Sequence, residues 1–99
     1  MATLAVMGTG NVVQDLFKEH NLSGLCSQVD TILFYAPQYS SAAAFRERPG
    51  VAELLGRIHQ QYQNHSLTSP RIEVYRREQL EELFLRADLV LNASNGYYP

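Results

Sequence analysis

The feature that most constrains the fold is a continuous apolar run, TILFYA, at residues 31–36, which Pro37 ends. A half-exposed strand alternates apolar and polar residues, whereas a strand covered on both faces reads as one apolar segment. This run shows no polar alternation. It therefore predicts a strand buried inside a parallel sheet, with helices on both sides.

Three other segments have strand character: residues 4–7, 71–75 and 89–92. The first of these is apolar and ends at Gly8-Thr9-Gly10, which is typical of a buried strand that enters a tight turn. We therefore predict about four strands in all.

Helical patterns separate these strands. Asn11 can cap a first helix, which residues 21–24 end, and a polar turn with one helical turn precedes Pro49. A second helix extends to about Asn64, and a third spans residues 78–86. The residues expected to face inward are Val13, Leu16, Phe17 and His20 in the first, Val51, Leu54, Leu55, Ile58 and Tyr62 in the second, and Leu80, Leu83 and Phe84 in the third.

This alternation of strands and helices predicts a small α/β, Rossmann-like three-layer sandwich with a mainly parallel sheet. We expect one domain over residues 1–99. A sheet this small leaves its flanks exposed, so a homodimer is expected.

Composition narrows the classes of function. Eight Lys and Arg against ten Asp and Glu give a net charge of −2, which provides no basic surface for duplex nucleic acid. Cys26 is the only cysteine, so an internal disulfide and a cysteine-based zinc site are excluded. No apolar stretch approaches the roughly 20 residues of a membrane span, and the start lacks signal-peptide features. A cytoplasmic protein that does not bind membranes is expected.

Three neutral, hydrogen-bonding loops follow strands of the predicted sheet. Ligands of open parallel sheets bind outside the carboxyl ends of the strands, where the strand order reverses. Backbone N–H groups of a glycine turn can bind phosphate, and amides, hydroxyls and aromatic rings can contact ribose or base. The predicted ligand-binding residues are Gly8, Thr9, Gly10 and Asn11 after the first strand, Gln38, Tyr39, Ser40 and Ser41 after the second, and Asn92, Ser94, Asn95, Gly96 and Tyr97 after the fourth.

Each loop also has a structural interpretation. The glycine turn can be a plain strand-to-helix connection, and Ser40 or Ser41 can cap the next helix. Asn95-Gly96 is a favoured turn pair, and Tyr97 can be a packing or dimer-contact residue. The functional interpretation is favoured because all three loops are predicted at the same edge of the sheet.

The remaining polar residues indicate no catalytic or metal site. His20, His59 and His65 lack metal-ligand spacing, and no Ser-His-Asp, P-loop or paired-carboxylate pattern is present. Arg46 and Arg48 flank the second loop and are expected at the surface, from which they could supply charge to a phosphate. A solvated helix face with local ion pairs is predicted for Arg76, Arg77, Glu78, Glu81, Glu82 and Arg86.

Two families share short motifs with this chain. LAVMGTGNV and LEELFLRADLVLNAS resemble the first strand with its glycine turn, and a later helix and strand, of NAD(P)-binding dehydrogenase domains. This resemblance implies NAD or NADP as the cofactor. Val13, however, occupies the place of the third small residue, and no acidic residue ends the second strand, since Asp30 precedes it.

The second resemblance is to CARF domains, the CRISPR-associated Rossmann folds that sense cyclic oligoadenylates. Gly8-Thr9-Gly10, YAPQYSS and NASNGYY are similar to the three ligand-contacting segments of that family, although Tyr98 stands where a basic residue is frequent. The resemblance implies an antiviral-defence module without a cofactor, which binds its nucleotide across a two-fold dimer. As an enzyme it would be a metal-independent ring nuclease that aligns a ribose 2′-hydroxyl with the neighbouring phosphate.

We favour the second family. The expected function is binding, with or without cleavage, of a cyclic oligoadenylate-type messenger in a homodimer. The alternatives are an NAD(P)-binding Rossmann domain or oxidoreductase fragment, and a non-catalytic protein-interaction module.

Overall fold

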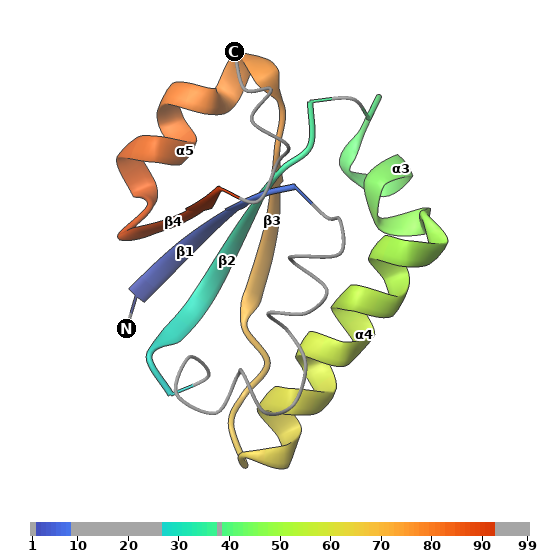
Figure 1. Cartoon of the computed structure of the whole chain (residues 1–99), viewed down its shortest axis with the longest axis vertical. Coiled ribbons are helices and arrows are strands. Elements are labelled where there is room, and N and C mark those ends of the chain that lie inside the picture. Colours follow the sequence, from blue (N-terminus) through green and yellow to red (C-terminus); the bar gives the residue numbers. More distant parts are fainter. Residues whose placement is uncertain (1, 9–26, 38, 93–99) are drawn as a thin grey trace.

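The computed structural model describes residues 2–8, 27–37 and 39–92 and contains a four-stranded, all-parallel sheet (Figure 1). The strands are β1 (Ala2–Met7), β2 (Val29–Tyr35), β3 (Arg71–Tyr75) and β4 (Leu89–Asn92), in the order β3-β2-β1-β4. The α/β fold class and the four parallel strands predicted from the sequence are confirmed. β1 and β2 each begin two residues earlier than their apolar runs, and β2 ends at Tyr35 rather than Ala36.

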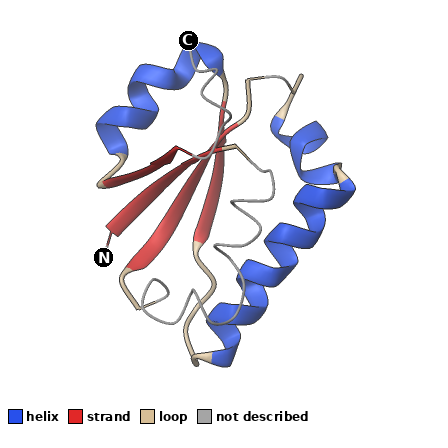
Figure 2. Cartoon of the chain, in the orientation of Figure 1, coloured by secondary structure: helices blue, strands red, loops and turns tan. Residues whose placement is uncertain are grey.

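The helices lie on both faces of this sheet (Figure 2). α3 (Ala42–Glu47) and α4 (Pro49–Asn64) cover one face, and α5 (Leu80–Arg86), preceded by the 3₁₀ helix η1 (Arg77–Gln79), covers the other. α3 ends before Pro49, as predicted, because proline disfavours helical backbone in the residue before it. Pro49 itself occupies the first turn of α4, where its missing N–H has no cost.

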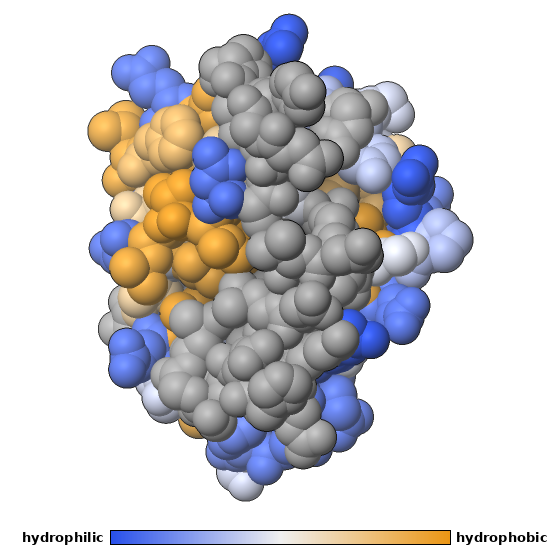
Figure 3. Space-filling model, in the orientation of Figure 1, coloured by the Kyte–Doolittle hydropathy of each residue, from blue (hydrophilic) through white to orange (hydrophobic). Residues whose placement is uncertain are grey.

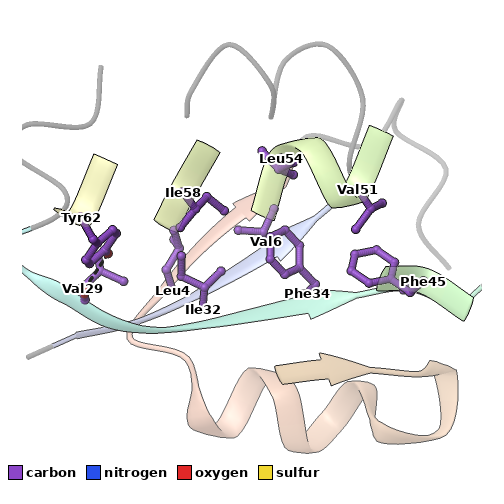
Figure 4. Packing of buried hydrophobic residues seen from close by; sticks show 11 residues of the cluster. Leu4, Val6, Val29, Ile32, Phe34, Phe45, Val51, Leu54, Ile58 and Tyr62 are labelled. Atoms are coloured by element: carbon purple, nitrogen blue, oxygen red, sulfur yellow. Dashed lines mark hydrogen bonds between the residues drawn. The ribbon is translucent and has the colours of Figure 1, made fainter. Parts of the chain in front are cut away.

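The core between the sheet and the α3–α4 layer is built from alternate strand residues (Figure 4). Phe34 on β2 packs against Phe45 on α3, with ring centroids 5.5 Å apart. At the other end of the layer, the buried Tyr62 hydroxyl donates a hydrogen bond of 2.7 Å to the carbonyl of Val29. The inward face predicted for α4 is confirmed, since Val51, Leu54, Ile58 and Tyr62 are all buried and Leu55 is partly so.

The inward face predicted for the last helix is only partly correct. Leu83 is fully buried against β1 and β2 residues, with Leu80 and Ala87 partly buried beside it. Phe84, which was also predicted to face inward, is 46% exposed. A helix turns by about 100° per residue, so the residue that follows Leu83 lies well off the line of contact.

The predicted local pairing of Arg86 on its own helix is wrong. Its guanidinium instead binds Glu73 of β3 through two hydrogen bonds, of 2.6 and 3.0 Å, and donates another to the Tyr75 hydroxyl. The hydrogen bond from Arg86 lowers the pKa of Glu73, against a smaller opposing effect of burial. Arg86 therefore ties α5 to the edge strand β3. Within the described residues, no helix is long and apolar enough to span a bilayer.

Two leucines on the same short helix test this packing. Leu83→Ala removes a fully buried side chain, and we expect it to lower the free energy of unfolding by about 2–5 kcal/mol. Leu85→Ala is the matched control, because Leu85 is 80% exposed, and its effect should stay within about 0.5 kcal/mol. Urea denaturation measures both, and equal losses would contradict the described orientation of α5.

Candidate functional site

All four strands end at one level. Met7, the last residue of β1, lies opposite Tyr35 of β2 on one side and Asn92 of β4 on the other. Tyr35 in turn lies opposite Tyr75, the last residue of β3. The segments that follow the four strands therefore leave the sheet from a common carboxyl edge.

The strand order reverses beside β1. The chain passes from β1 to β2 and β3 on one side, and then returns to place β4 on the other side. In open α/β sheets, the crevice outside such a reversal is where ligands bind. Here it lies between Met7 and Asn92, next to two of the loops predicted from the sequence.

Gly8 is the first residue after β1. Its φ of 111° lies in a region that side chains disfavour, so glycine is required for this backbone path. The rest of the tight turn predicted here, Thr9 and Gly10, lies outside the described residues.

The β2 loop contributes structural contacts as well as exposed polar groups. The ring of Tyr39 packs edge-on against Phe45 at 5.3 Å, and the Arg48 guanidinium lies 5.5 Å from its centroid. Ser41 caps α3, since its hydroxyl accepts a hydrogen bond of 3.1 Å from the Ala44 N–H. The capping alternative is thus confirmed for Ser41, while Ser40 is exposed beside it.

The other predicted ligand residues lie outside the described residues. They are Thr9, Gly10, Asn11, Gln38, Ser94, Asn95, Gly96 and Tyr97. Of the predicted set, the structure places Gly8, Tyr39, Ser40, Ser41 and Asn92, all in or after the ends of β1, β2 and β4.

Arg76 is a polar residue at this edge that the sequence analysis did not assign to it. It directly follows Tyr75, and its N–H is held by the Gln79 side chain at 3.0 Å. Its Nε atom is shielded from solvent and has no hydrogen-bond partner. The sequence signal for this placement is that Arg76 directly follows a predicted strand. Its charged neighbours instead led to the prediction of a solvated helix face.

A cavity of about 390 Å³ lies at the opposite, amino edge of the sheet. Val29, Tyr62 and Leu67 contribute apolar surface, and Asp30, Thr68 and Ser69 contribute polar groups. The Ser69 hydroxyl also contacts the Nδ1 atom of His59. This cavity is at the far end of the strands from the predicted ligand-binding residues that the structure describes.

The histidines that the structure describes make local contacts. His65 hydrogen-bonds the Gln61 carbonyl through Nδ1 at 2.9 Å, at the end of α4. Among residues 2–8, 27–37 and 39–92, no three His, Cys, Asp or Glu side chains gather closely enough to hold a metal ion.

Comparison with known proteins adds no relative: no family model, curated protein or solved structure matches this chain.

Two adjacent serines test whether the Ser41 hydroxyl stabilises the protein as a helix cap. Ser41→Ala removes the α3 cap and should lower the free energy of unfolding by about 1 kcal/mol, with or without a ligand. Ser40→Ala, the matched control, should change it by less than about 0.5 kcal/mol. Thermal unfolding measures both variants, and a Ser41→Ala protein as stable as the parent would contradict the capping role.

Proposed function

We propose that this protein binds a nucleotide at the carboxyl edge of its sheet, and that a cyclic oligoadenylate-type molecule is its ligand. The observation that carries the proposal is the reversal of strand order at β1, with a positive-φ glycine directly beyond it. A glycine there lets a ligand approach the backbone closely. A phosphate held by backbone N–H groups suits such a turn.

The loop after β2 supports a role in holding the nucleoside. Tyr39 is half-buried against Phe45 and next to Arg48, so its ring is held in place rather than free to rotate. Ser40 beside it has an exposed side chain. An aromatic ring and a hydroxyl suit a base and a ribose as ligands. They do not suit a divalent cation, which prefers carboxylate and carbonyl oxygens.

Exposed apolar residues support the homodimer. The four large hydrophobic residues exposed in the described part of the chain all belong to α5 and β4: Phe84, Leu85, Leu89 and Val90. Figure 3 shows hydrophobic surface over this region of the molecule. β4 is the edge strand next to the reversal, so side-chain packing of two copies over α5 and β4, about a two-fold axis parallel to the strands, would set the two half-sites side by side. We take the partner to be a second copy of this chain.

The dinucleotide alternative receives less support. In dinucleotide-binding sheets an acidic residue near the end of the second strand holds the ribose hydroxyls. Here β2 ends in Tyr35, followed by Ala36 and Pro37. Asp30 lies at the start of β2 and borders the amino-edge cavity, so it is at the wrong end of the strand for that role.

Cleavage of the bound ring is a separate property. It would depend on aligning a ribose 2′-hydroxyl with the adjacent phosphate, and positioning alone can supply a large share of such a rate. Mass spectrometry of the ligand after prolonged incubation distinguishes binding from cleavage, because cleavage leaves a linear product with a cyclic-phosphate end.

Calorimetric titration with cyclic tetra-adenylate tests the binding proposal. The parent protein should bind, and Gly8→Ala should bind at least tenfold more weakly, because a side chain at this φ strains the turn. Gly56→Ala is the matched control: a Cβ there meets nothing within 4 Å, so affinity should be unchanged. Thermal melts verify that both variants fold.

Two outcomes would contradict the proposal. Absence of binding by the parent protein at high micromolar concentration would remove cyclic tetra-adenylate as a ligand. Tighter binding of NADH, measured by its fluorescence, would favour the dinucleotide alternative instead.

A further inference from the structure

The end of β3 brings an arginine to the proposed nucleotide edge. The backbone of Arg76 remains extended, with φ −105° and ψ 174°, so the alternation of side chains along β3 continues through it. Ile72 and Val74, four and two residues earlier, pack into the core on the α3–α4 side. The Arg76 side chain therefore leaves the sheet on that same side.

This position is next to the connection that leads from β2 to α3. The Ala36 N–H donates a hydrogen bond of 2.8 Å to the Tyr75 carbonyl, which joins the two strand ends directly before Arg76. Figure 1 shows the end of β3 beside that connection. Arg76 thus borders the segment that carries Tyr39 and Ser40.

The Arg76 side chain is 41% exposed, and one of its guanidinium donors lacks a partner. Its Nε is shielded from solvent without a hydrogen-bond partner, and the nearest carboxylate oxygen, on Glu78, lies 3.9 Å away. That distance is too long for a hydrogen bond, although it allows a weak ion pair. A buried donor without an acceptor is costly, and an anionic oxygen placed there would remove the cost.

Three other arginines of the described chain are engaged within the protein. Arg86 holds Glu73 by two hydrogen bonds, and Arg46 donates to the Ile72 carbonyl at 2.9 Å. Arg57 pairs with Glu53 on the same helix. By contrast, Arg76 has a shielded donor at the strand end and no strong intramolecular acceptor for it.

We propose that Arg76 binds a phosphate group of the ligand, as a second anchoring point beside the Gly8 turn. This inference rests on the proposed nucleotide-binding function. The ends of β1 and β3 are two strand spacings apart, about 10 Å. A ligand that uses both points therefore carries at least two separated phosphates, as a linked or cyclic oligonucleotide does and a mononucleotide does not.

Neighbouring arginines provide the test. Arg76→Gln should weaken binding of cyclic tetra-adenylate ten- to a hundredfold, because a charge-assisted hydrogen bond to phosphate is lost. The plot of log Kd against log salt concentration should also become less steep by about 0.7, the contribution of one phosphate contact. Arg77→Gln removes an exposed charge one residue away, so affinity and slope should stay within about twofold of the parent.

Adenosine 5′-monophosphate is the second ligand. With one phosphate it should use only one of the two anchoring points, so Arg76→Gln should weaken its binding less than that of cyclic tetra-adenylate. Parent protein that binds neither ligand would overturn the proposed function, and the Arg76 inference with it. Two results would overturn the role of Arg76 alone, provided that the parent protein binds cyclic tetra-adenylate. One is an Arg76→Gln variant with the affinity and salt slope of the parent. The other is an Arg77→Gln variant that loses as much affinity as Arg76→Gln.

Discussion

The structure depends on the pairing of β1 with a parallel strand on each side. Five successive residues, Thr3 to Met7, pair with β2, and four of these also pair with β4. At the start of β4 the Asp88 carboxylate accepts a hydrogen bond from the Thr3 N–H, and the Asp88 N–H donates to the Thr3 carbonyl, each at 2.8 Å. These two bonds align β4 with β1, so their last residues lie side by side.

That alignment creates the candidate site. Because every strand is parallel and ends in register, Gly8, Ala36 and Arg76 are the first residues beyond three neighbouring strands, and Asn92 ends the fourth. The same parallel arrangement requires helices on both faces, which explains why β2 is apolar and buried from Ile32 to Tyr35. The edge combines a glycine turn, an anchored tyrosine and an arginine, which suits a ligand with both phosphate and nucleoside parts.

Local pattern was sufficient to predict the described elements but not their neighbours. The first predicted helix, with Val13, Leu16, Phe17 and His20 facing inward, lies outside the described residues. β3 and β4 have the bounds that the sequence predicted, since each is a short apolar or alternating run between clear turn signals. The strand order carries no local signal, so the reversal at β1 emerged only from the structure. The prediction that Phe84 faces inward was wrong because its helix is short. An apolar stripe of only two turns does not fix the direction in which the helix contacts the sheet to within one residue.

Charged residues were the hardest to predict. The RREQLEELFLR segment has the composition of a solvated helix, yet Arg86 pairs across to β3 and Arg76 lies at the strand end. Long side chains reach partners that sequence spacing does not reveal. Ser41 shows the converse, because a helix cap and a ligand-binding hydroxyl look identical in sequence and only the bond to Ala44 separates them.

The measurement that tests the account most directly is a titration of isotope-labelled protein with cyclic tetra-adenylate, followed through its backbone amide resonances. Nucleotide binding at the carboxyl edge predicts saturable shifts at Gly8, Tyr39, Arg76 and Asn92, with little change at Asp30 and Thr68 around the amino-edge cavity. Shifts confined to that cavity, or no shifts at all, would contradict it.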